Sequence, residues 1–153
     1  MTLLSPHFSF EELIFSEIAL RKGLDNTPDA AQRMNLSRLC ALALEPARDI
    51  LGVPIHVNSG FRSTGVNAAV GGAANSSHMA GLAADILPIG VPLLNAFNAL
   101  RTNLKGLDQI IQECGPAGWI HLSIPEGGDT PRGQALLASG GPGHWQYYEA
   151  PAI

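Results

Sequence analysis

Residues 76–85 read Ser-Ser-His-Met-Ala-Gly-Leu-Ala-Ala-Asp, and residues 119–123 read Trp-Ile-His-Leu-Ser. Together they contribute two imidazoles and one carboxylate, those of His78, Asp85 and His121, in a chain that has five histidines. Two nitrogen ligands and one oxygen ligand around an open fourth position are the ligand set of a catalytic zinc site, where a bound water is activated. These three residues are therefore the candidate metal ligands, and one zinc ion is the expected cofactor.

The spacing of these residues fits a loop followed by a strand rather than one helix. His78 and Asp85 are too far apart in sequence to occupy neighbouring turns of a helix, as the two histidines of a His-Glu-x-x-His motif do. Gly81 and the small alanines between them allow the backbone to approach closely. The second segment alternates with period two, which places Trp119, His121 and Ser123 on one face and Ile120, Leu122 and Ile124 on the other.

The composition is that of a folded domain, with 46% hydrophobic and 14% charged residues in 153. A net charge of −4 argues against nucleic acid as a partner, because nucleic-acid binders carry basic patches. We expect no membrane anchoring, since no apolar run is long enough to span a bilayer. The N-terminal sequence lacks the features of a secretory signal, which predicts synthesis in the cytoplasm. Of the two cysteines, Cys40 is expected to be a buried thiol and Cys114 a residue that does not bind the metal.

Helical periodicity predominates in the first third of the chain, and strand-like segments predominate after it. Ser9 precedes two glutamates as an N-cap would, and apolar spacing predicts a helix over 28–51 that Pro46 kinks or divides. Strands are expected over 54–58, 82–87, 107–112 and 119–124. A short helix is expected over 66–70 and a longer one over 92–104. Residues 126–143 are expected to form a loop or flap. These elements predict one α+β domain over 1–153, with helices packed on a small, mostly antiparallel sheet. Residues 1–8 and 138–153 are expected as peripheral arms.

The pattern Ser76-x-His78-x-x-Gly81-x-Ala83-x-Asp85, followed downstream by Trp119-Ile120-His121, resembles the zinc D-alanyl-D-alanine peptidases. That family includes cell-wall carboxypeptidases, dipeptidases and phage peptidoglycan endopeptidases, and it shares its fold with the hedgehog signalling domain. Residues 57–63, Val-Asn-Ser-Gly-Phe-Arg-Ser, resemble the Ser-Gly-Tyr-Arg-Ser segment of the family, and residues 107–113 resemble its pre-catalytic strand. The similarity covers residues 8–137, with the motifs in the family's order.

The resemblance implies zinc bound by His78, Asp85 and His121, and hydrolysis of an amide bond that involves D-alanine. It implies a peptidoglycan peptide as the substrate and the bacterial cell wall or periplasm as the site of action, as in a phage lysis enzyme. Arg62 matches the arginine that binds a substrate carboxylate or stabilises the oxyanion, roles that suit a planar guanidinium. Ser76 is expected to bind the substrate or to orient the loop of His78, and Trp119 is expected to bind the substrate as a wall of the pocket. The choice between carboxypeptidase and endopeptidase, and the oligomeric state, stay open.

The general base does not occupy its usual place. Many relatives have a carboxylate three residues before the second histidine ligand, but here that position is Gly118. Glu113 is the candidate base, because a carboxylate at the end of the preceding strand can fold back over the metal and carry a proton to the leaving amine. Asp108 is the alternative.

Two other interpretations compete with a zinc hydrolase. The first is a binding or virion-associated module that zinc stabilises without turnover, which Gly118 at the usual base position favours. The second is a different metal, since manganese and iron also accept two histidines and one carboxylate.

Overall fold

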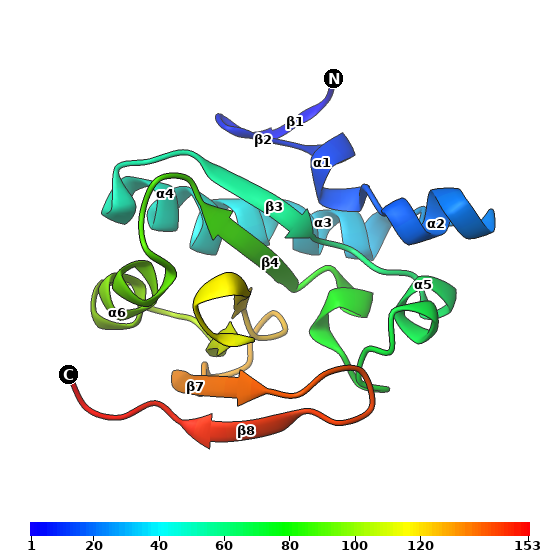
Figure 1. Cartoon of the computed structure of the whole chain (residues 1–153). Helices are drawn as coiled ribbons and strands as arrows, with labels where there is room; N and C mark the ends of the chain where they lie inside the picture. The colour runs from blue at the N-terminus through cyan, green and yellow to red at the C-terminus, as the bar shows by residue number, and fades with distance from the viewer.

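A six-stranded mixed sheet forms the centre of the computed structural model, which describes residues 1–153 (Figure 1). The strands are β3 (Ile55–Ser59), β4 (Ala83–Pro88), β5 (Gln109–Glu113), β6 (Trp119–Ser123), β7 (Gln134–Ser139) and β8 (Gln146–Glu149). Their order across the sheet is β3-β4-β6-β5-β7-β8, and every neighbouring pair is antiparallel except β5 with β7. The predicted α+β fold with a small, mostly antiparallel sheet is therefore confirmed.

The helices are short, and most of them precede the sheet in sequence. They are α1 (Phe10–Ile14), α2 (Glu17–Lys22), α3 (Ala30–Leu39), α4 (Glu45–Leu51), α5 (Thr64–Ala69) and α6 (Leu93–Asn103), with the 3₁₀ turns η2 (Ser77–Ala80) and η3 (Gly115–Ala117). Ser9 caps α1 as predicted, and it forms a capping box with Glu12 that satisfies two free backbone N–H groups. Ser9 also ends β2 (Phe8–Ser9), which pairs with β1 (Leu3–Ser5) in a separate small hairpin.

The long helix predicted over 28–51 contains an irregular segment in its middle but continues beyond it. A π-helical segment, η1 (Cys40–Leu44), connects α3 to α4, and Glu45 N donates its hydrogen bond to Cys40 O, five residues back. Pro46 follows directly, and a proline ring clashes with the carbonyl four residues earlier in a regular helix. The wider π turn therefore accommodates Pro46 without ending the helix.

One face of the sheet packs on the helices, and the other face carries Asp85 and His121 beside a small apolar cluster of Ile111, Leu136 and Ala138. Ile120 and Leu122 of β6 are fully buried in the main core, together with Leu39 of α3 and Leu100 of α6. Burying each such side chain contributes about 1.5–3 kcal/mol. In Figure 1, α3 and α4 run on the far side of β3 and β4, and α6 contacts β4, β5 and β6. The alternate residues of β6, Trp119 and His121, consequently lie on the opposite face, as the sequence alternation predicts.

The C-terminal third differs from its predicted structure. Residues 126–143 were expected to form a loop, but 134–139 form β7, which pairs in parallel with β5. The chain then turns and returns as β8, antiparallel to β7, so the expected C-terminal arm forms the outer strand of the sheet (Figure 1). The expectation of a loop was wrong because backbone pairing with β5, which is distant in sequence, decides the conformation of this segment.

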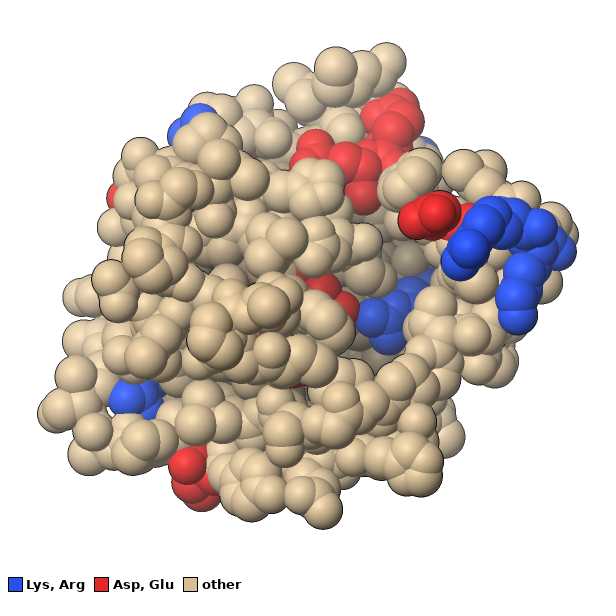
Figure 2. All heavy atoms as spheres, in the orientation of Figure 1, with Lys and Arg blue, Asp and Glu red and all other residues tan.

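Charged side chains are sparse on the surface. On the face in Figure 2, most atoms belong to uncharged residues, and the acidic and basic groups lie in small separate clusters. None of the helices has the length and apolar character needed to cross a membrane.

Candidate metal centre

His78 is held in place by a tight turn between α5 and β4. It lies in η2, where Ser76 Oγ accepts a hydrogen bond from His78 N at 3.3 Å. The turn ends at Gly81, whose φ of 74° is in the left-handed region that favours glycine. A side chain at this position would also collide with the backbone carbonyl of Gln32 in α3. The small residue in the motif is therefore required by the turn that positions the histidine.

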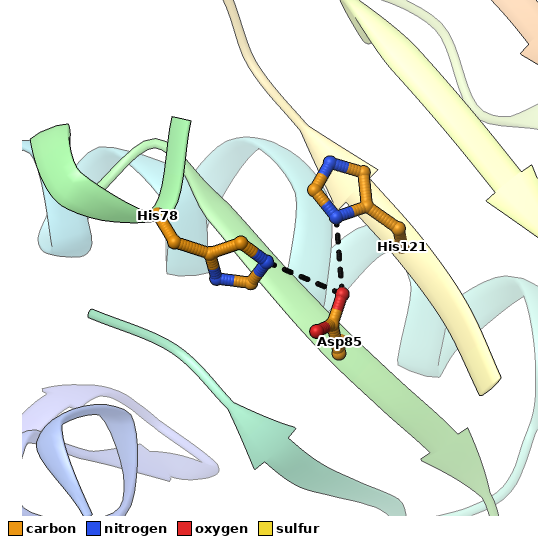
Figure 3. Close-up of side chains that lie close together, drawn as sticks. All are labelled: His78, Asp85 and His121. Carbon is orange, nitrogen blue, oxygen red and sulfur yellow. Dashed lines mark hydrogen bonds and ion pairs between the residues drawn. The ribbon is translucent and has the colours of Figure 1, made fainter. Parts of the chain in front are cut away.

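Asp85 and His121 are direct cross-strand partners in the β4–β6 pair, so their side chains project from the same face of the sheet. Asp85 Oδ1 lies 3.0 Å from His121 Nδ1 and 3.3 Å from His78 Nε2 (Figure 3). One ligand atom from each of the three residues lies within 4.8 Å of the others. The structure thus brings together the three residues that the sequence singled out.

The chemistry of these donors fits a metal ion. His78 Nδ1 lies 2.7 Å from Gly60 O, and a carbonyl oxygen can only accept, so Nδ1 carries the proton. Burial lowers the pKa of His78, which is only 2% exposed, and this favours the neutral tautomer, in which Nε2 presents a lone pair. Nε2 lies 3.3 Å from Asp85 Oδ1, so in that tautomer a nitrogen and an oxygen lone pair face each other, and a metal ion can take the place between them. A hydrogen bond to the other ring nitrogen is also the usual way in which proteins orient a histidine ligand.

Arg62 is bound to the carboxylate of Asp85. Its Nη2 donates to Asp85 Oδ2 at 2.9 Å, and its Nε and Nη1 donate to Ser59 Oγ and Asn67 Oδ1. Burial raises the pKa of the Asp85 carboxyl, but His78 and His121 outweigh it, and the net pKa lies well below the usual range. Arg62 occupies Oδ2, which leaves Oδ1, the oxygen that lies nearest both histidines, as the candidate ligand atom.

Glu113 ends β5 beside Trp119, its cross-strand partner in β6. Trp119 Nε1 donates to Glu113 Oε2 at 2.9 Å and so fixes the carboxylate. Burial, and next the negative charge of Asp85, raise the pKa of the Glu113 carboxyl, as suits a group that takes up and returns a proton. Gly118 lies so close to the Glu113 carbonyl that any Cβ there would collide with it. A carboxylate at 118 is therefore incompatible with this turn, which explains the glycine at the usual base position.

Asp108 is engaged elsewhere. Arg132 donates to both of its carboxylate oxygens, with Nη2 2.7 Å from Oδ2, and this arginine lowers the pKa of the Asp108 carboxyl. Asp108 lines a second, neighbouring pocket and is absent from the lining of the cavity that holds the three donors. The contact of Asp108 with Arg132 and its place in another pocket favour Glu113 over Asp108 as the candidate base.

The metal donors open into a cavity of about 750 Å³. Four other residues singled out from the sequence, Arg62, Ser76, Glu113 and Trp119, line it, whereas the alternative base Asp108 does not. Cys114 also lines it, although its Sγ is not among the clustered ligand atoms. His7, His56 and His144 are exposed and lie outside the cavity.

Sequence reasoning missed two aromatic residues that line the cavity, Trp145 and Tyr147. Tyr147 belongs to β8, and Trp145 packs edge-on against Trp119 with 6.3 Å between ring centroids. The alternation Trp145-Gln146-Tyr147 was the available signal, because it is the pattern of a strand with one aromatic face. The glycines around this segment indicated a loop instead of a strand.

Comparison with known proteins agrees with this geometry. A search of the curated proteins found no match. The family model of Peptidase M15 matches residues 6–123, a segment that contains all three metal donors together with Arg62 and Glu113. The match covers most of the chain, and the donor cluster within it is the kind of site that a metallopeptidase needs. The chain therefore belongs to the Peptidase M15 family of metallopeptidases.

Proposed function

We propose that the chain is a zinc-dependent peptidase that hydrolyses a D-alanine-containing amide bond in the peptides of bacterial peptidoglycan. The observation that carries this proposal is the convergence of His78, Asp85 and His121 in a cavity that Glu113 also lines. Two nitrogen donors and one oxygen donor favour zinc with an open vertex. The substrate, and the cell wall as the site of action, rest on the resemblance of residues 57–63 and 76–85 to the D-alanyl-D-alanine peptidases.

The three donors would hold the ion, and Glu113 would move the proton. A bound zinc supplies Lewis acidity, which polarises the scissile carbonyl and lowers the pKa of a water. Glu113 accepts the proton of the attacking water through its carboxylate and then delivers it to the departing amine nitrogen. The indole N–H of Trp119 keeps Glu113 Oε2 in a fixed position, so that the other oxygen is free to face the water.

Arg62 has two parts in this scheme. Its hydrogen bond to Asp85 Oδ2 holds the ligand carboxylate, and its position in the cavity wall puts positive charge near the reacting carbonyl. A guanidinium has five N–H donors, of which three are used by Ser59, Asn67 and Asp85. The remaining donors are available to a substrate carboxylate or to the oxyanion.

The experiment replaces the proposed base, Glu113, by glutamine and makes the same replacement at an exposed glutamate as a control. Glu113→Gln should keep its metal and its melting temperature but lose at least about 100-fold in kcat, the typical contribution of a general base. Glu17→Gln is the control, because the Glu17 side chain is 76% exposed on α2, outside the cavity. Hydrolysis is followed by mass spectrometry of purified muropeptides, and elemental analysis identifies the metal in protein purified without added ions.

The outcomes separate the competing interpretations. Full activity of Glu113→Gln removes Glu113 as the base, and a metal other than zinc points to manganese or iron at the same donors. A wild-type protein that holds zinc but cleaves no muropeptide supports the binding module instead. The masses of the products distinguish loss of a terminal D-alanine from cleavage within a cross-link.

A further inference from the structure

The hairpin of β7 and β8 lies C-terminal to residues 6–123, the segment that matches the family, yet it forms one wall of the cavity. The turn between its strands contacts the loop after α5, where Gly71 approaches Pro142 so closely that a side chain would collide with the proline. Trp145, just before β8, packs against Trp119 of β6. The hairpin is thus fixed to the site at two places.

The strand register places Tyr147 in line with the catalytic carboxylate. Trp119 pairs with Glu113, Glu113 with Ala138, and Ala138 with Tyr147, so these four residues form one row across β6, β5, β7 and β8. Directly paired residues project from the same face of a sheet. Ala138 is the small member of the row, and it leaves space between Glu113 and the phenol ring. Tyr147 consequently lines the cavity, whereas the next residue, Tyr148, faces away from it.

The hydroxyl of Tyr147 is available to a ligand. Tyr148 Oη donates to Gln146 Oε1 at 2.8 Å, whereas no protein group accepts a hydrogen bond from Tyr147 Oη. Burial, and next the negative charges of Glu113 and Asp85, raise the pKa of the Tyr147 phenol, so it stays a protonated donor at neutral pH. A protonated phenol in the cavity wall can donate to a neutral acceptor such as a peptide carbonyl.

We propose that Tyr147 is a substrate-binding residue whose hydroxyl donates a hydrogen bond to a backbone carbonyl of the bound peptide, opposite Glu113. The β7–β8 hairpin then contributes a substrate contact to the peptidase site, although it lies outside the residues that match the family model. This inference rests on the proposed function, because it assigns a contact to the peptide which that function requires.

The test compares Tyr147→Phe with Tyr148→Phe. The two tyrosines are neighbours on one strand and are similarly exposed, 50% and 53%, so each exchange removes one hydroxyl from a comparable surface. Loss of one neutral hydrogen bond to the ground state raises KM roughly three- to tenfold and leaves kcat unchanged. We expect this rise for Tyr147→Phe alone, measured on the muropeptide that the wild type cleaves, with metal content and melting temperature unchanged in both variants.

Two kinetic results would overturn the inference while the proposed function stands. One is an active Tyr147→Phe with the KM of the wild type, and the other is an equal rise in KM for both variants. A fall in melting temperature or metal content confined to Tyr147→Phe would assign the residue a structural role and would equally overturn it. A wild-type protein that cleaves no muropeptide refutes the proposed function, and the inference fails with it.

Discussion

Replacing Arg62 by methionine should weaken metal binding without removing any metal ligand. The Arg62 side chain is 15% exposed and donates to Asp85 Oδ2 at 2.9 Å, while the Asp85 side chain is 7% exposed. Removing a partner that orients a metal ligand typically lowers affinity 10- to 100-fold, which is about 1.4–2.8 kcal/mol. Methionine preserves the apolar stem of the arginine and removes its donors, so the charged contact with Asp85 is lost together with the hydrogen bonds to Ser59 and Asn67.

The apoprotein should also lose stability. Breaking a fully buried ion pair costs about 3–5 kcal/mol, and an exposed pair contributes about 0–1 kcal/mol. The Arg62–Asp85 pair lies nearer the buried limit, but Asp85 keeps its contacts to His78 and His121. We therefore expect the free energy of unfolding of the metal-free protein to fall by about 2–3 kcal/mol, measured by urea denaturation.

Arg132→Met is the matched control. Arg132 also pairs with an aspartate, but its side chain is 55% exposed and its partner, Asp108, is not among the metal donors. Metal affinity, measured by competition with a chromogenic chelator, should be unchanged in this variant. The reasoning is refuted if Arg62→Met binds zinc as tightly as the wild type, or if both variants weaken binding equally.

Two further predictions concern titration and thiol reactivity. Metal affinity should fall as the pH drops below about 6, because an imidazole must be neutral to bind a metal ion. Burial lowers the pKa of His78, so protons compete with the metal at this residue only at a more acidic pH than at an ordinary histidine. Equilibrium dialysis that finds the metal content unchanged down to about pH 4 would show that the donors are wrongly assigned. Iodoacetamide at about pH 8 should alkylate the exposed Cys114 and spare Cys40, because burial raises the pKa of the Cys40 thiol to about 12. Mass spectrometry of the digested protein locates the adducts, and rapid labelling of Cys40 would mean that the core around it opens.

The parts of the fold predicted correctly are those with a strong local signal. Residues 119–123 alternate between apolar and polar side chains, and the structure has β6 over the same residues, with its aliphatic face in the core. The helix predicted over 92–104 is α6, Leu93–Asn103, because its apolar residues recur at helical spacing and face the sheet. The donor set was also visible, since two ligands lie in one motif and the third lies on an alternating strand.

The missed parts depend on contacts between residues far apart in sequence. The segment 134–139 contains mostly alanine and leucine without alternation, and it forms β7 because β5 pairs with it on one side and β8 on the other. Nothing in residues 126–143 identifies that partner. The contact of Arg62 with Asp85 was missed for the same reason, because the path of the loop after β3 determines where the guanidinium lies.

The close approach of Gly118 to the Glu113 carbonyl limits how the candidate site can be redesigned. Because the backbone carbonyl of Glu113 occupies the place that a Cβ at 118 would take, position 118 accepts no side chain within the present turn, whatever residue stands at 113. Transferring the carboxylate from 113 to 118 would require rebuilding η3 at the same time, and no single codon change achieves both. A route that proceeds one residue at a time would therefore have to change the turn before a carboxylate could stand at 118.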